Sequence, residues 1–169
     1  NGGYTVVDNG KAELYSDKNI MVLVPHQDDE LLVAGGIIEE YIKYGSNVSF
    51  VFSTNGDALK PGETRLTEAL SVAAVLGVPE KNVYFLGYGD RCVDGVHLYN
   101  SPDDALVPSQ AGFTQTYGLD SHPAVNPGNT YTKANLRSDL KSVISKEKPD
   151  IIYCVEVELH PDHSALSLL

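Results

Sequence analysis

The sequence predicts an α/β fold, a three-layer sandwich in which a mostly parallel sheet lies between helices. Strand-like and helix-like segments alternate along the chain, as expected when a crossover helix follows each strand. The strand-like segments are continuous apolar runs, which is typical of strands that are covered on both faces. Ligands of such sheets bind beyond the carboxyl ends of the strands, so we expect the functional residues there.

The first part of the chain predicts an arm, two strands and the helix between them. Residues 1–18 are rich in Gly, Asn and Asp, and we expect an irregular N-terminal arm. The apolar run "NIMVLV" (19–24) predicts a buried strand. The segment "ELLVAGGIIEEYIKYG" (30–45) has helical spacing and ends in a glycine suited to a C-terminal cap. "NVSFVFST" (47–54) predicts the second strand.

The strand–helix alternation continues in the next part of the chain. "GETRLTEALSVAAVLG" (62–77) predicts a helix, which Gly77 closes, with Pro79 just beyond it. "NVYFLG" (82–87) predicts the third strand. The order strand, helix, strand, helix, strand therefore covers residues 19–87.

Residues 88–131 form a long segment with many Gly, Pro, Asn, Asp and Ser and little periodicity. A loop of this length inside a compact domain is often functional. We expect it to form part of the wall or lid of a substrate pocket, with a tyrosine such as Tyr99 or Tyr117 against the substrate. After it, residues 132–148 predict an amphipathic helix and residues 149–157 a fourth strand.

Length and composition indicate one globular domain, which we place at residues 19–169. The chain has 169 residues, of which 42% are hydrophobic and 21% charged, enough for a substantial core. The last residues resemble the start of a helix, so we expect that more protein follows and that the domain is truncated at its C-terminal end. The net charge of −11 argues against nucleic-acid binding, which needs clustered Lys and Arg. No apolar stretch reaches the roughly 18 residues expected of a membrane span.

The sequence says little about compartment or oligomeric state. Cys92 and Cys154 lie far apart in the sequence and need not form a disulfide. Cys154 lies within "DIIYCV" and is expected to pack as a small buried residue. The chain begins without Met and has an Asn- and Gly-rich arm. Both features slightly favour an exported protein whose leader has been removed.

Two polar motifs, "HQDD" (26–29) and "HPDH" (160–163), follow the first and the fourth predicted strands. His26 and Asp29 lie three residues apart across a strand-to-helix turn, so both can reach one point, and His163 can supply a third ligand. Two imidazoles, one carboxylate and an open fourth position are typical of a catalytic zinc site, although non-haem iron uses the same set. The plainer alternative is that an aspartate of the first motif only caps the following helix.

Asp28 and His160 complete a candidate catalytic set. Asp28 lies next to a proposed ligand but faces another way, so it can act as a general base for a water molecule. His160 can donate a proton or stabilise an oxyanion. The alternative for the second motif is a solvated turn in which Asp162 caps a helix.

Three further polar residues are candidates for substrate binding. Asn55 and Asp90 follow the second and the third predicted strands, on the same rim of the sheet as the two motifs. Arg65 lies near the start of the helix that follows Asn55. The alternatives are an ordinary turn for Asp90 and a surface ion pair between Arg65 and Glu68.

The motifs "PHQDDE", "TNGD", "RLTEALSVAAVLGV", "FLGYGD" and "HPDH" carry a resemblance to the LmbE-like/PIG-L family of zinc-dependent N-acetylglucosaminyl deacetylases. The resemblance runs from about residue 19 to the end, and residues 88–131 stand outside it. It implies a Rossmann-like α/β fold and hydrolysis of N-acetyl groups from amino sugars. Family members continue past the second motif with more sheet and helix.

The resemblance also implies roles for single residues. It implies that His26, Asp29 and His163 hold the zinc ion. Asp28 is then the general base, and His160 stabilises the oxyanion. Arg65 and Asp90 fall at positions similar to the sugar-contacting residues of the family. Gln27 departs from the Pro that is commonest at its position, and we expect its side chain to point away from the metal.

The leading hypothesis is a zinc hydrolase that removes an acetyl group from an N-acetylated amino sugar or its conjugate. One alternative is a metal-dependent amidohydrolase that acts on a non-sugar amide, because the same catalytic core suits both substrates. The other alternative is a truncated sugar-binding domain that keeps the metal site but lacks turnover.

Overall fold

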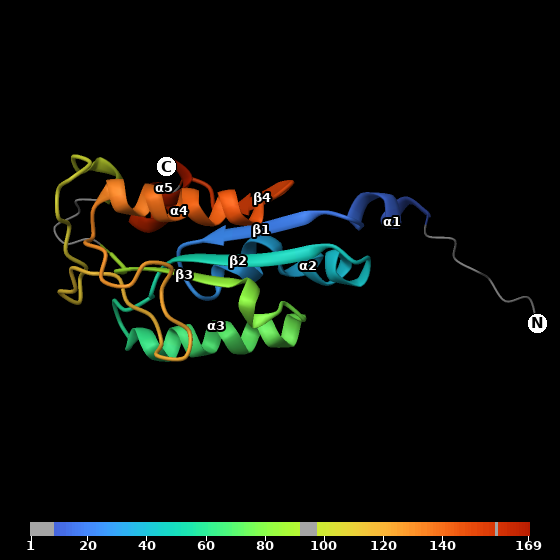
Figure 1. Cartoon of the computed structure of the whole chain (residues 1–169), viewed down its shortest axis with the longest axis horizontal. Coiled ribbons are helices and arrows are strands. Elements are labelled where there is room, and N and C mark those ends of the chain that lie inside the picture. Colours follow the sequence, from blue (N-terminus) through green and yellow to red (C-terminus); the bar gives the residue numbers. More distant parts are fainter. Residues whose placement is uncertain (1–8, 92–97, 158) are drawn as a thin grey trace, which may run out of the picture.

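Four parallel strands form the sheet at the centre of the protein. The computed structural model describes residues 9–91, 98–157 and 159–169. The strands lie in the order β3-β2-β1-β4, and their bounds are β1 Asn19–Val24, β2 Asn47–Thr54, β3 Val83–Tyr88 and β4 Ile151–Cys154. Every pairing in this sheet is parallel. The predicted α/β fold with a parallel sheet is therefore confirmed, and Figure 1 shows the strands side by side with helices around them.

The helices connect the strands in two directions. Their bounds are α1 Asn9–Tyr15, α2 Asp29–Lys43, α3 Gly62–Leu76, α4 Lys133–Glu147 and α5 Pro161–Ser167, with short 3₁₀ turns at Glu80–Asn82 (η1) and Leu98–Asn100 (η3). The chain steps outward from β1 through β2 to β3, and then returns to place β4 on the other side of β1. Right-handed crossovers then place α2 and α3 on one face of the sheet and α4 on the other.

The core consists of the apolar strand residues and the helix residues that cover them. Val22 of β1 lies opposite Phe50 of β2, and Phe52 of β2 lies opposite Phe85 of β3. All four side chains are fully buried, and burial of each such residue contributes about 1.5–3 kcal/mol. Helix α3 ends where the sequence predicts, at Gly77, whose positive φ of 81° suits a glycine.

Three expectations about the ends of the chain need correction. The predicted irregular arm over residues 1–18 contains helix α1 from Asn9 to Tyr15, and residues 1–8 lie outside the described residues. The fourth strand covers Ile151–Cys154 instead of residues 149–157, and its last residue lies opposite Leu23 of β1. Cys154 is exposed, since β4 is an edge strand, while Cys92 lies outside the described residues.

The outer edge of β3 is covered by the long segment that follows it. The Val125 amide donates to the Phe85 carbonyl (2.8 Å), and the Tyr117 amide donates to the Gly87 carbonyl (3.3 Å). The third contact is from a side chain, because His122 Nε2 donates to the Val83 carbonyl at 2.8 Å. These contacts anchor residues 117–125 along the sheet.

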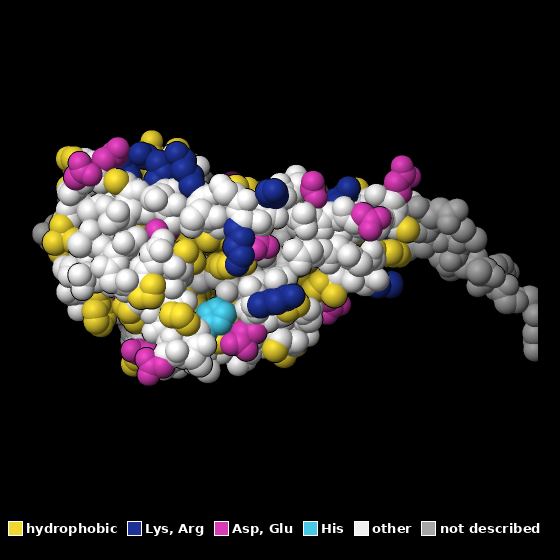
Figure 2. Space-filling view, in the orientation of Figure 1, with side chains coloured by type: hydrophobic (Ala, Val, Ile, Leu, Met, Phe, Trp, Pro, Cys, Tyr) yellow, Lys and Arg dark blue, Asp and Glu magenta, His cyan; other side chains and the backbone are white. Residues whose placement is uncertain are grey.

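The surface shows mixed charge on the face in Figure 2. Basic and acidic side chains are interspersed there with hydrophobic ones, and no continuous basic stripe crosses the described part of this face. Among the described residues, no helix has the length and apolar character needed to cross a bilayer.

Candidate metal and catalytic site

The site lies where the strand order reverses, between β1 and β4. The turn after β1 carries the first motif, and α5, which follows β4, carries the second. In open parallel sheets the crevice at such a reversal point is the usual ligand position. Residues after β2 and β3 come to the same edge of the sheet (Figure 1).

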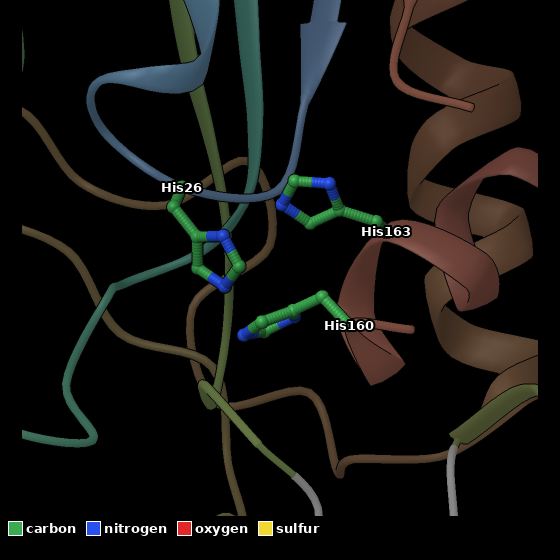
Figure 3. Close-up of side chains that lie close together, drawn as sticks. All are labelled: His26, His160 and His163. Atoms are coloured by element: carbon green, nitrogen blue, oxygen red, sulfur yellow. The ribbon is translucent and has the colours of Figure 1, made fainter. Parts of the chain in front are cut away.

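Two of the predicted metal ligands, His26 and His163, converge on the carboxylate of the third, Asp29. Its Oδ2 lies 3.1 Å from His26 Nδ1 and 3.2 Å from His163 Nε2, and it accepts the backbone N–H of His26 at 3.1 Å. The side chains of His26 and Asp29 are buried, with exposed fractions of 11% and 8%. Figure 3 shows the rings of His26, His160 and His163 pointing toward one another, the first from the turn after β1 and the others from the start of α5.

The donor set of this cluster suits a metal ion. One nitrogen from each of His26, His160 and His163 lies within 4.8 Å of the others. Imidazole and carboxylate groups at this spacing are ordinary ligands of zinc and of other divalent metals. The geometry therefore fits a bound metal, and the residues do not identify which metal it is.

Two further carboxylates face the other nitrogen of His26. The sequence predicts Asp90 on this rim as a substrate contact, but it predicts no contact of either carboxylate with His26. Asp162 Oδ2 lies 3.2 Å and Asp90 Oδ1 3.4 Å from His26 Nε2. These three residues and His160 form a second group of potential ligands within 4.8 Å. The only signal for Asp162 in the sequence is its place inside the second motif, where the alternative role is that of a helix cap.

The carboxylates around His26 favour a positive charge at its position. Burial by itself would lower the pKa of His26, but hydrogen bonds with Asp162, Asp29 and Asp90 raise this pKa to about 11. Burial also opposes the ionisation of Asp29, but the hydrogen bond and charge of His26, together with His163, lower the pKa of Asp29. The carboxylates around His26 thus stabilise a cation at this position, whether a proton or a metal ion.

His160, not Asp162, caps helix α5. Its Nδ1 accepts the backbone N–H of Asp162 at 3.3 Å, so in the neutral ring the proton is on Nε2. Burial and the nearby charge of His26 lower the pKa of His160, which favours this neutral form. An Nε2–H group can donate a hydrogen bond to an oxyanion.

Asp28 faces away from the ligands and into a cavity. Its side chain is 63% exposed, and its Oδ1 lies 3.4 Å from Arg65 Nη2. It makes no capping hydrogen bond to α2, so the structure does not support the capping alternative. Arg65 pairs with Asp28 and not with Glu68, so the structure does not support the alternative of a surface pair between Arg65 and Glu68. Glu68 lies 4.0 Å from Lys60.

A hydrogen bond keeps the side chain of Gln27 away from the metal ligands. The Gln27 side chain donates to the Thr54 carbonyl at 2.7 Å and so points toward the end of β2, as expected for a residue that does not bind the metal. Gly56 has a positive φ of 62°, and a Cβ there would lie 2.4 Å from Gln27 Oε1. A glycine at this position therefore lets the two turns pack closely.

One cavity of about 230 Å³ opens beside the cluster. It is lined by His26, Asp28, Gly56, Ala58, Leu59, Lys60, Arg65, Asp90, Arg91 and His160. Arg91 and Lys60 are lining residues that sequence reasoning missed, since a single cation in a loop carries no pattern. A separate cavity of about 380 Å³ between α2 and β4 reaches Asp29 and His163 from another side.

Asn55 and the two tyrosines Tyr99 and Tyr117 are predicted substrate contacts, but their side chains bind other parts of the protein. Asn55 is fully buried and donates its side-chain amide to the carbonyls of Tyr117 (3.0 Å) and Gly87 (3.4 Å), which favours a structural role. Tyr117 donates its hydroxyl to Asp57 Oδ2 at 2.7 Å, and the amino group of Lys133 lies over the ring of Tyr99.

The long segment contributes two residues to the cavity wall within its described part, Asp90 and Arg91. The Asp90 amide donates to Asp57 Oδ1 at 2.8 Å, which holds Asp90 next to His26. Residues 92–97 of this segment lie outside the described residues. The other described residues of the expected lid, including Tyr99 and Tyr117, do not line the cavity.

Comparison with known proteins gives related deacetylases. Residues 21–169 match the model of the family described as PIG-L, GlcNAc-PI de-N-acetylase. A 1D-myo-inositol 2-acetamido-2-deoxy-alpha-D-glucopyranoside deacetylase of Kribbella flavida is 25% identical over 167 residues, which cover 87% of this chain and 50% of that protein. This chain thus spans about half the length of that relative.

Two solved structures share the fold. One is a conserved protein of Thermus thermophilus (TM-score 0.55, 20% identity, covering 90% of this chain and 53% of that one). The other is an N,N'-diacetylchitobiose deacetylase of Pyrococcus horikoshii (TM-score 0.58, 22% identity, covering 90% of this chain and 48% of that one). At these identities the likeness to the two structures shows the fold.

Proposed function

This chain belongs to the PIG-L family of GlcNAc-PI de-N-acetylases, and on that premise we propose that it carries the catalytic core of a metal-dependent hydrolase. The reaction is removal of the N-acetyl group from an amino sugar or its conjugate. The observation that carries the proposal is the convergence of His26 and His163 on Asp29, beside a cavity that is lined by His26, Asp28 and His160. The deacetylase names of the family and of the Kribbella flavida relative support the same chemistry.

Zinc is the ion that we propose for the three ligands His26, Asp29 and His163, with ferrous iron as the alternative. When bound, such an ion polarises the acetyl carbonyl and lowers the pKa of a water molecule. Two imidazoles and one carboxylate leave coordination positions for substrate and water. The carboxylates of Asp90 and Asp162 hold the His26 ring in place from its other side.

The remaining residues act on protons and on the developing charge. Asp28 takes a proton from the water that attacks the acetamide carbon, and Arg65 keeps the Asp28 carboxylate oriented. The Nε2–H group of His160 donates a hydrogen bond to the carbonyl oxygen as that oxygen becomes negative. The C–N bond then breaks, Asp28 returns the proton that it took from water to the leaving nitrogen, and acetate and the free amino sugar are released.

Mass spectrometry of the products tests this function. The purified chain, loaded with Zn²⁺ and separately with Fe²⁺, is incubated with N-acetylglucosamine, N,N'-diacetylchitobiose and, as a non-sugar amide, N-acetyl-lysine. We expect acetate and free amine from at least one of the sugars, and none after the metal has been removed with a chelator. Faster release from N-acetyl-lysine would favour a non-sugar amidohydrolase, and no release from any substrate by metal-loaded protein would refute the proposal.

A further inference from the structure

Another cavity, of about 320 Å³, lies away from the metal cluster and is called the β3 cavity here. It opens between α4 and residues 121–125, along the first half of β3 (Figure 1). The catalytic cavity lies beyond the opposite, carboxyl end of the strands, and the described residues that line the two cavities are all different. The size of the β3 cavity is within the range of pockets that bind small molecules, about 300–1,000 Å³.

One part of the β3 cavity has an apolar and aromatic wall. Val83, Phe85 and Val143 line it and are otherwise packed in the core, with almost no exposed surface. The ring of His122 lies edge-to-face with the ring of Phe85, and His122 Nε2 donates to the Val83 carbonyl at 2.8 Å, so this imidazole is fixed. Tyr84 provides a further aromatic surface. A ligand with a flat, apolar body suits walls of this kind.

Two lysines add positive charge to the β3 cavity. Lys146 Nζ donates to Tyr84 Oη at 2.9 Å and lies 4.7 Å from the centre of the Tyr84 ring, so its ammonium group is held in position. Lys81 lines the same cavity. Neither lysine forms an ion pair within the described part of the chain. Both ammonium groups therefore retain N–H groups that can donate to a ligand.

The acidic residues next to the wall bind other groups of the protein. Glu80 Oε1 lies 3.4 Å from His122 Nδ1, and Glu147 accepts a hydrogen bond from the hydroxyl of Tyr84. Neither glutamate lines the cavity, although both offset part of the positive charge. A ligand with one negative charge therefore suits the site better than a doubly charged phosphate.

We propose that the β3 cavity is a binding site for a small aromatic carboxylate. The aromatic ring of the ligand lies against Tyr84 and His122, in the offset or edge-to-face arrangements that aromatic pairs prefer. The carboxylate accepts charge-assisted hydrogen bonds from Lys81 and Lys146. The site is separate from the metal cluster, so this proposal goes beyond the deacetylase function and does not depend on it.

Three small probes separate the contributions of ring and charge. Benzoate has both, benzamide has the ring without the charge, and acetate has the charge without the ring. Each is titrated into the metal-loaded chain, and binding is followed from the backbone amide shifts in ¹H–¹⁵N NMR spectra. We expect benzoate to shift the amides of Val83, His122 and Val143, and to bind about 10-fold more tightly than either other probe.

Substitution of the two lysines tests the charged contact. Lys81→Gln and Lys146→Gln each remove one charge but keep a polar side chain. Each should weaken the binding of benzoate about 3- to 10-fold and leave the affinity for benzamide unchanged. The double variant should bind benzoate and benzamide equally. Lys141→Gln, the same change at an exposed lysine of α4 outside the cavity, is the matched control and should keep the preference for benzoate.

Four outcomes would overturn the proposal. Benzoate that shifts only the amides around His26 and Asp29 binds at the metal cluster and not in the β3 cavity. Equal affinities of the wild-type chain for benzoate and benzamide would show that the lysines recognise no carboxylate. An unchanged preference for benzoate in the double variant would show the same. Binding of acetate as tight as that of benzoate would show that the aromatic wall contributes nothing.

Discussion

Asp28 and Asp29 are adjacent in the sequence but occupy opposite environments. The Asp29 side chain is 8% exposed and lies between the imidazoles of His26 and His163. The Asp28 side chain is 63% exposed and faces Arg65 across the cavity. The difference arises because Asp29 is the first residue of α2, whereas Asp28 precedes the helix with a non-helical backbone (φ 153°, ψ −25°), so that the two side chains point in different directions. The two carboxylates can therefore divide metal binding from proton transfer.

Substitution of single residues tests this division. Asp28→Asn should retain the metal and lower kcat about 10²- to 10⁴-fold, because a positioned base is lost while the ligands remain. His163→Ala should lose metal and activity together. Metal content is measured by plasma mass spectrometry and kcat by acetate release.

The control for Asp28→Asn is Asp104→Asn, the same change at an exposed aspartate outside the cavity, which should alter neither quantity. Loss of the metal from Asp28→Asn would make Asp28 a ligand and reverse the roles of the two aspartates.

The sequence predicts those site residues that follow strand ends in a recognisable pattern. His26, Asp29 and His163 could be expected to meet because parallel strands end at one edge of the sheet. Asp162 and Arg91 could not be assigned in this way, because their importance depends on contacts with residues distant in the sequence. Asn55 follows a strand as the other candidates do, but its amide is used to hold the loop at Tyr117.

At the scale of elements, residues 117–125 replace a fifth strand along β3. Three alternate carbonyls of β3, those of Val83, Phe85 and Gly87, accept hydrogen bonds from this segment. One donor is the side chain of His122, so the sequence of this segment does not show the pattern of a strand. Composition predicted a loop in this region, but backbone pairing of this irregular kind has no sequence period and could not be predicted. The covered edge is protected from pairing with other chains.

A buried carboxylate of α4 holds the residues that follow this segment. Asp139 is 1% exposed and accepts hydrogen bonds from Tyr88 Oη (2.9 Å) and Asn129 Nδ2 (3.1 Å), and also from Asn126 Nδ2. It joins α4, the end of β3 and residues 126–129. A carboxylate accepts all three bonds, whereas an amide presents an N–H₂ group to at least one donor.

Asp139→Asn should therefore lower the free energy of unfolding by about 1–3 kcal/mol, the cost of leaving a buried donor unsatisfied. Urea denaturation followed by circular dichroism measures this change. Glu39→Gln, the same carboxylate-to-amide change at an exposed position of α2, is the control and should leave the unfolding curve unchanged. An Asp139→Asn variant as stable as wild type would show that the three hydrogen bonds are dispensable.

At the scale of the whole molecule, the site joins parts of the chain that are far apart in sequence. His26 and Asp29 belong to the turn between β1 and α2, whereas His163 belongs to α5, which follows β4. The order of the sheet brings these parts together, since β4 returns to the side of β1. The apolar strands made the parallel sheet predictable, but the exposure of Ile152 (42%) and Cys154 follows from the edge position of β4, which local sequence does not reveal.

A metal ion that binds these ligands should stabilise the entire fold, because the unfolded chain does not hold them together. The stabilisation is RT ln(1 + [metal]/Kd), about 2.7 kcal/mol at a free metal concentration 100 times Kd. We expect the Tm from differential scanning calorimetry to rise with added Zn²⁺ and to fall after chelation. His163→Ala should abolish the dependence on metal. His122→Ala removes a histidine outside the cluster, so it should retain the metal-dependent rise even if its basal Tm is lower. An equal rise in Tm for wild type and His163→Ala would place the stabilising ion elsewhere.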